Sequence, residues 1–233
     1  MINFNSFAAA VALSSLLSAT ASATTVAYTD KSSYDAATAA LTATQLENFD
    51  GIPENTQYPS GSGPAPLTFT YSIPGYLLTV NSGFETTSGT NFLGLNNASL
   101  TFGDKAFNLG DSFTISFGRT VNAVGLYLVA GDDAMPGDLE LSTSTGSVFN
   151  GSNPLIITPG NNAFFLGLVE TDPLHGFTSA TVRGIVPQDA PGAFLAFTAD
   201  DITSAAAPVP EPGSWILMLA GLGIAAAGGL RRR

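Results

Sequence analysis

The sequence predicts an all-β protein, built as a single β-sandwich or jelly-roll domain with a short N-terminal helix. Several short runs alternate polar with apolar residues, as half-buried strands do. Clusters of Gly, Pro and Asn separate these runs and are typical of turns. No long segment has the 3.6-residue apolar period that βαβ units need, so a sandwich is favoured over an α/β fold.

The predicted strands are clearest in the middle of the chain. Residues 112–117 read Ser-Phe-Thr-Ile-Ser-Phe, and the same alternation continues in two later runs, through Val124, Leu126 and Leu128 and through Phe164, Leu166 and Leu168. Turns are expected between them, at Phe117-Gly118, Pro136-Gly137, 151–154 and 159–162.

One short helix is expected before the strands. The segment 32–35, Ser-Ser-Tyr-Asp, is similar to a helix cap, and 36–41 would follow with Tyr34, Ala37 and Leu41 on one face. The sandwich is predicted over 24–204, followed by a Pro-rich linker over 205–212.

Charge excludes one class of partner. All 18 acidic residues lie between Thr24 and Pro212, and the basic residues of that segment are Lys31, Lys105, Arg119 and Arg183. An acidic body does not attract phosphates, so nucleic acid is not an expected partner. The chain has no cysteine, which excludes disulfides and thiolate metal sites.

The N-terminal segment has the pattern of a signal peptide. Residues 7–17 form an apolar run of the length of an h-region, and Ala21-Ser22-Ala23 offers small residues at the cleavage positions. Residues 1–23 are therefore predicted to be removed on export.

The C-terminal end predicts a membrane helix. Residues 213–230 carry no charge, and a helix of that length spans roughly 27 Å, enough for a hydrocarbon core. The basic cluster Arg231-Arg232-Arg233 would stay in the cytoplasm, so the body is expected outside.

This end resembles the PEP-CTERM sorting signal, in which Pro-Glu-Pro precedes a hydrophobic helix and a basic terminus; the residues are Pro210, Glu211 and Pro212. The resemblance implies recognition and cleavage by an exosortase, transient inner-membrane anchoring, and a final place at the cell surface or outside the cell. It also implies a Gram-negative host that makes exopolysaccharide and biofilm. A permanent single-span anchor is the alternative.

Two motifs in the body are similar to exported jelly-roll domains found upstream of such tails, and more loosely to carbohydrate-binding modules. They are 46–51, Leu-Glu-Asn-Phe-Asp-Gly, and 197–202, Phe-Thr-Ala-Asp-Asp-Ile. The resemblance implies that the first and last strands lie side by side. Glu47 or Asp50 would then approach Asp200 and Asp201 and form a Ca²⁺ site. If that stretch is extended, only one of the two adjacent aspartates would be a ligand. The alternative is that these residues are ordinary solvated turn carboxylates.

Enzymatic chemistry is not expected. His175 is the single histidine, within a predicted loop, and no Gly-x-Ser-x-Gly elbow occurs. A second acidic group, Asp132, Asp133, Asp138 and Glu140, is interpreted as a solvated loop.

The function predicted from the sequence is that of an exported, non-catalytic surface or extracellular-matrix protein. A calcium-assisted exopolysaccharide-binding module is the alternative, and an extracellular hydrolase is a minor one. The body has no tryptophan, the residue on which sugar-binding faces most depend, although Tyr58, Tyr71, Tyr76 and Tyr127 offer other aromatic rings.

Overall fold

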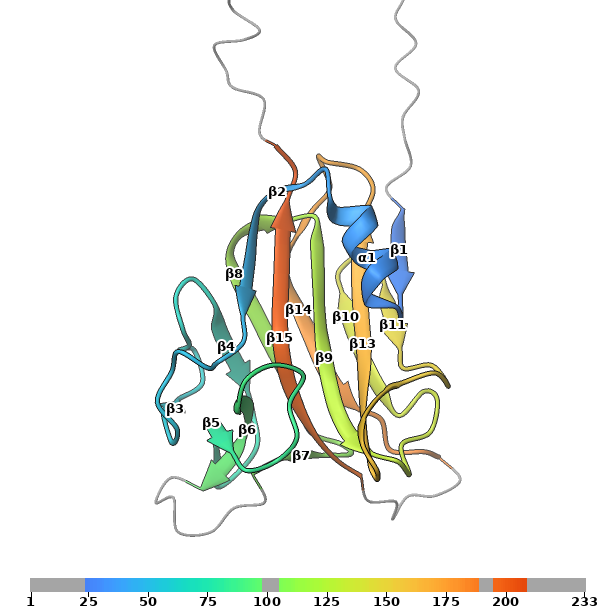
Figure 1. The fold of residues 1–233 in the computed structure, drawn as a ribbon. Helices are drawn as coiled ribbons and strands as arrows, with labels where there is room; N and C mark the ends of the chain where they lie inside the picture. The colour runs from blue at the N-terminus through green and yellow to red at the C-terminus, as the bar shows by residue number, and fades with distance from the viewer. Residues whose placement is uncertain (1–23, 98–104, 189–194, 209–233) are drawn as a thin grey trace, which may run out of the picture.

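The computed structural model describes residues 24–97, 105–188 and 195–208, which form two antiparallel β-sheets packed face to face (Figure 1). Sheet A has the order β1 (Thr25–Tyr28), β13 (Asn161–Glu170), β9 (Ala123–Gly131), β15 (Ala196–Ala206), β6 (Asn91–Asn97), β5 (Tyr76–Ser82) and β3 (Gln57–Tyr58). Beside this path, β12 (Leu155–Thr158) pairs with β13, while β2 (Thr42–Glu47) and β7 (Phe107–Asn108) pair with β15.

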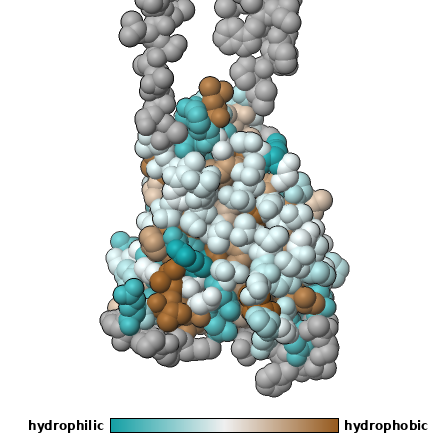
Figure 2. Space-filling model, turned by 180° about the vertical axis from the view of Figure 1, so that it is seen from behind, coloured by the Kyte–Doolittle hydropathy of each residue, from teal (hydrophilic) through white to brown (hydrophobic). Residues whose placement is uncertain are grey.

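Sheet B covers the other side of the core. Its order is β11 (Ser147–Phe149), β10 (Leu139–Thr143), β14 (Phe177–Gly184), β8 (Ser112–Val121) and β4 (Thr68–Tyr71). The prediction of an all-β sandwich is confirmed. The face seen in Figure 2 is mostly of intermediate hydropathy, with hydrophobic residues in small groups. The outward positions of sheet B include Ser112, Thr114 and Thr181, uncharged polar residues that suit a half-exposed sheet.

Several predicted targeting features lie outside the described residues. They are the signal peptide (1–23), the C-terminal helix (213–230), the sorting residues Pro210, Glu211 and Pro212, and the closing arginines Arg231, Arg232 and Arg233. Within the part of the chain that the structure describes, no helix is both long and apolar enough to cross a membrane.

Phenylalanine rings join the two sheets. Phe107 of β7 stacks on Phe113 of β8 with ring centroids 4.8 Å apart, and on Phe197 of β15 at 5.3 Å. Phe69 of β4 meets Phe113 edge-on. All four are at most 1% exposed, so this column ties sheet B to the first residues of β15.

The helix α1 (Lys31–Thr38) confirms the predicted short helix but begins earlier than expected. Asp30 is the N-cap, because its carboxylate accepts a hydrogen bond from the Ser33 N–H. A strand that the sequence analysis missed, β1, precedes the helix. The helix lies on the outer face of sheet A, where Tyr34 packs on Phe165 with ring centroids 5.1 Å apart.

Two glycines admit the Tyr34 ring to the sheet. Gly125 of β9 and Gly167 of β13 pair directly across the ladder. A Cβ atom at Gly167 would lie 2.6 Å from the Tyr34 ring, and one at Gly125 would lie 3.1 Å from it. The helix therefore buries the outer face of β9 and β13, and these strands do not show the one-sided alternation expected from their sequences.

Two predicted boundaries differ from the structure. The turn expected at Phe117-Gly118 is wrong, because β8 continues to Val121 with a register shift against β14. Gly118 has φ 68°, a conformation that glycine adopts without steric cost within such an irregularity. The last strand ends at Ala206, two residues inside the predicted linker, and Ala205 is buried.

The first and last strands of the described structure place both of its chain ends at one end of the sandwich. β1 starts and β15 ends at the same end of the molecule (Figure 1). Asn122 fixes this end, since its side-chain oxygen accepts from Ala207 N–H at 2.9 Å and its amide group donates to the Asp172 carbonyl at 3.1 Å. The opposite end holds the candidate site.

Candidate functional site

The acidic residues singled out in the sequence lie around one loop. β2 and β15 pair side by side, as expected, with Glu47 opposite Ile202. The loop in question, residues 83–90, connects β5 to β6 and is called here the β5–β6 loop.

A β-bulge places Asp200 and Asp201 differently from the expectation. Asp200 pairs with Tyr127 of β9 and Thr203 pairs with Gly125, so β15 carries one extra residue between these pairs. Asp201 has φ 51°, in the left-handed region. The two carboxylates therefore do not point to opposite faces of a regular strand, and both reach the β5–β6 loop. The expectation of a single ligand assumed a regularly extended strand, and the bulge removes that condition.

These two carboxylates bind consecutive residues of the loop. The Asp200 Oδ2 atom accepts from the Thr87 N–H and hydroxyl, both at 2.9 Å, and from the Ser88 N–H at 3.2 Å. Asp201 accepts from the hydroxyls of Thr87 and Ser88, each at 2.8 Å. Charge-assisted bonds of this kind are stronger than neutral ones, so they hold the loop against β15.

Asp50 holds the far end of the same loop. Its Oδ1 atom accepts from the N–H groups of Thr90 and Asn91 at 2.8 and 3.1 Å. A Cβ atom at Gly89 would lie 2.0 Å from both Asp50 carboxylate oxygens, so only glycine fits there. Glu47 is used locally, since its carboxylate accepts from the Phe49 N–H at 2.8 Å.

Asp50, Asp200 and Asp201 thus accept hydrogen bonds from protein N–H and hydroxyl groups and hold the β5–β6 loop in place. This set of contacts is called here the clasp. Across residues 24–97, 105–188 and 195–208, no group of three or more His, Cys, Asp or Glu side chains is arranged to hold a metal ion. A Ca²⁺ site at Glu47, Asp50, Asp200 and Asp201 stays a prediction from the sequence, and the contacts of these residues do not favour it.

Asp200 is an unusual carboxylate because it is fully buried. Burial and, secondarily, the neighbouring charge of Asp201 raise the pKa of Asp200 to about 6, although the hydrogen bonds from Thr87 and Ser88 act in the opposite direction. The clasp therefore contains a group that titrates just below neutral pH.

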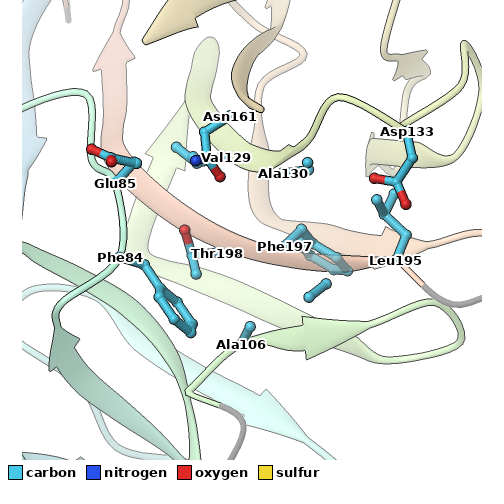
Figure 3. Close-up of a pocket in the computed structure, with 12 residues that line it drawn as sticks. Phe84, Glu85, Ala106, Val129, Ala130, Asp133, Asn161, Leu195, Phe197 and Thr198 are labelled. Carbon is cyan, nitrogen blue, oxygen red and sulfur yellow. The ribbon is translucent and has the colours of Figure 1, made fainter. Parts of the chain in front are cut away.

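Beside the clasp, the β5–β6 loop forms one wall of a pocket (Figure 3). The pocket has a volume of about 320 Å³. The loop contributes Phe84 and Glu85, and the other lining residues come from β9, from the start of β13, from the start of β15 and from nearby turns: Ala106, Val129, Ala130, Gly131, Asp133, Asn161, Leu195, Ala196, Phe197 and Thr198. Most of these side chains are apolar, as is usual in ligand pockets.

Thr198 supplies a buried hydroxyl to this pocket. The residue is 3% exposed, and its Oγ1 atom has no hydrogen-bond partner among the described residues. Figure 3 shows the Thr198 side chain between Phe84 and Phe197, with its hydroxyl on the side of the Asn161 amide. A buried hydroxyl without a partner costs stability.

Phe84 is the exposed aromatic ring of the site. It is 50% exposed and stacks on the buried ring of Phe92, with centroids 5.7 Å apart and an interplanar angle of 7°. This stacking keeps the ring at the pocket even though the loop has no regular secondary structure. Phe84 was not predicted from the sequence, where the available signal was a bulky aromatic residue in a short polar loop directly after a glycine.

The other candidate residues have structural roles. Asp133 lines the pocket, but Glu140 is buried on β10 and pairs with Arg183, so the solvated-loop interpretation is wrong for Glu140. His175 lies in the loop after β13, as expected, and its Nδ1 atom is 2.7 Å from the Asp172 carboxylate. Hydrogen bonds to Leu174 and His175 lower the pKa of Asp172.

The tyrosines considered for ligand stacking lie elsewhere. The Tyr71 hydroxyl donates to the Tyr58 carbonyl at 2.8 Å, and Tyr58 is buried in the core. Tyr127 packs against Phe165 on the outer face of sheet A. The pocket was invisible to local patterns because its walls come from segments more than 100 residues apart.

Residues 208–233 match the family model of the PEP-CTERM protein-sorting motif. The chain therefore carries a PEP-CTERM protein-sorting motif at its C-terminal end, and this motif supports export and sorting by an exosortase. A search of curated proteins found no match.

Proposed function

We propose that this protein is a non-catalytic component of the cell surface or extracellular matrix, whose β-sandwich binds a partner outside the cell. The observation that carries the proposal is the position of the sorting motif. The motif begins at residue 208, shortly after β15 ends at Ala206, and β15 ends at the side of the sandwich opposite to the pocket.

The sandwich acts as a spacer between the sorted end and the pocket. Thr198 lies near the start of β15 and Ala206 at its end. At about 3.3 Å per residue, a strand of this length separates the two by about 25 Å. While the tail is attached to the membrane, the pocket therefore faces away from the bilayer. After cleavage, the same end remains available.

The position of His175 argues against imidazole catalysis at the pocket. The Asp172–His175 pair lies in the loop that follows β13, whereas the pocket includes Asn161 at the start of that strand. Since β13 spans the sandwich, the histidine lies far from the pocket. An imidazole there cannot act as a general base on a ligand in the pocket.

Glu211→Ala tests the sorting part of the proposal. Loss of the charge between two prolines should abolish exosortase recognition, so the unprocessed chain should accumulate in the membrane fraction. Asp35→Ala, which removes an exposed carboxylate outside residues 208–233, is the matched control and should mature normally. Normal maturation of Glu211→Ala would contradict the proposal. Immunoblots of membrane, surface and medium fractions give the readout.

A further inference from the structure

The pocket beside the β5–β6 loop has the chemistry of a site for one kind of ligand. Its base is apolar, with Val129, Leu195 and Phe197 among the lining residues, and the half-exposed ring of Phe84 stands at its edge. Such walls favour a ligand with a C–H-rich face, because contact removes apolar surface from water.

Polar groups in the pocket require that the ligand also carry hydrogen-bonding groups. The Thr198 hydroxyl, buried and without a partner in the described structure, can both donate and accept. Asn161 brings an amide to the same space, and its Nδ2 atom is directed to the Thr158 hydroxyl at 3.3 Å. A ligand hydroxyl that reaches Thr198 would remove the cost of its unpaired state.

The charge of the pocket excludes anions. Glu85 and Asp133 both line it, and its described lining includes no lysine or arginine. The chain as a whole has a net charge of −11. A uronic acid, a phosphorylated sugar or another anion would meet like charge there, whereas neutral hydroxyl groups can donate to the carboxylates.

We propose that this pocket binds a neutral sugar ring of an extracellular glycan. One face of the ring packs against Phe84 and the apolar base, while its hydroxyl groups bond to Thr198, Asn161 and the carboxylates of Glu85 and Asp133. This proposal rests on the proposed function, because the sandwich domain must be outside the cell to meet such a glycan. It adds the ligand class and the binding site. The clasp of Asp200 and Asp201 on Thr87 and Ser88 positions Phe84.

The test uses purified residues 24–208, which contain all the described strands and the whole core cluster. Titration calorimetry is carried out with tetrasaccharides of glucose, mannose, galactose and N-acetylglucosamine, and with tetragalacturonic acid as the anionic probe. We expect at least one neutral probe to bind, and the anionic probe to bind at least about tenfold more weakly. Failure of every neutral probe, or equal binding of the anionic one, overturns the proposal.

Two variants locate the binding in the pocket. Phe84→Ala should weaken the bound neutral probe about tenfold, because stacking on the ring is lost. Thr198→Val keeps the side-chain shape, removes the unpartnered hydroxyl, and should weaken binding about fivefold with no loss of thermal stability. Phe149→Ala removes a similarly exposed ring from β11 and is the matched control. Unchanged affinity in both pocket variants overturns the assignment.

The sorting assay and the calorimetry test different proposals, so a negative result in one does not affect the other. Loss of sorting in cells does not affect the affinity of the purified domain, and absence of affinity does not alter maturation. The calorimetry samples are also assayed for new reducing ends. If Phe84→Ala and Thr198→Val weaken binding and new reducing ends appear, the sugar site stands and the non-catalytic role is wrong.

Discussion

The buried carboxylate of Asp200 accepts two hydrogen bonds from Thr87, one from its N–H and one from its hydroxyl, both at 2.9 Å. This contact joins the last strand of the sandwich to a loop more than 100 residues earlier. It also fixes the segment that carries Phe84 into the pocket. Residues that the sequence suggested as metal ligands thus support a binding site by holding its wall.

Thr87→Val should destabilise the domain and loosen the pocket wall. The substitution removes the hydroxyl that Asp200 and Asp201 share, while the N–H donors of Thr87 and Ser88 and the Ser88 hydroxyl remain. Loss of a hydrogen bond to a charged group costs about 1.5–3 kcal/mol. The free energy of unfolding from urea titrations measures the effect. Thr70→Val, at an exposed position of β4, is the control and should change it by less than about 0.5 kcal/mol. Equal stability of the two variants would show that the clasp contributes nothing.

Asp200 should make stability depend on pH between about 4 and 6. The pKa of Asp200 is raised from 3.8 to about 6 in the folded state. A raised folded pKa contributes stability below the unfolded value, and that contribution is lost as the pH rises through about 6. The difference between the two pKa values corresponds to about 3 kcal/mol.

Asp200→Asn provides the comparison for this pH effect. Asparagine has the same shape and does not titrate, so the melting temperature of the variant should fall less than that of the wild type between pH 4.5 and pH 7. All other carboxylates are common to both proteins, and the difference between their melting curves therefore isolates Asp200. Parallel curves would mean that Asp200 titrates normally in the folded protein.

Calcium should leave the melting temperature of residues 24–208 unchanged relative to EDTA. The carboxylates of Asp50, Asp200 and Asp201 already accept hydrogen bonds from loop N–H and hydroxyl groups, and a cation would have to displace them. A ligand that binds only the folded state raises the melting temperature. A rise with millimolar calcium, abolished in Asp201→Asn, would therefore establish the metal site that the sequence suggested.

Phe107→Ala should be among the most destabilising single substitutions in the core. Phe107 is fully buried and stacks on both Phe113 and Phe197, so truncation leaves a cavity between the sheets. The expected loss is about 3–5 kcal/mol in the free energy of unfolding. Phe149→Ala, at a 45% exposed ring on β11, should cost less than about 1 kcal/mol by the same denaturant titration. A small effect at Phe107 would show that the column does not join the sheets.

The fold class was predictable because strands and turns leave local signals. The alternation over 112–117 corresponds to the first part of β8, and the turns at Pro136-Gly137 and Pro159-Gly160 lie between strands, as expected. The placement of β2 beside β15 also agrees with the resemblance to jelly-roll domains. The outer-face burial of β9 and β13 was not predictable, since it depends on where α1 packs.

The site was predictable only in its acidic residues and not in their role. Asp200 and Asp201 stand out in the sequence as an acidic pair, but their orientation depends on a bulge set by pairing with β9. Phe84, Asn161 and Thr198 come from three distant segments, and nothing local relates them. These three residues form one pocket only because the two-sheet fold brings their segments together at the same end of the sandwich.

The sequence by itself determined the sorting motif of this protein, because a sorting signal is a short linear segment and needs no tertiary contacts. It also determined the all-β class, through periodicity and turn residues. Only the tertiary structure decided that the acidic residues clasp a loop, that Thr198 keeps a buried unpaired hydroxyl, and that the pocket lies opposite the sorted end. Those properties depend on long-range pairing and burial, which local sequence patterns do not encode.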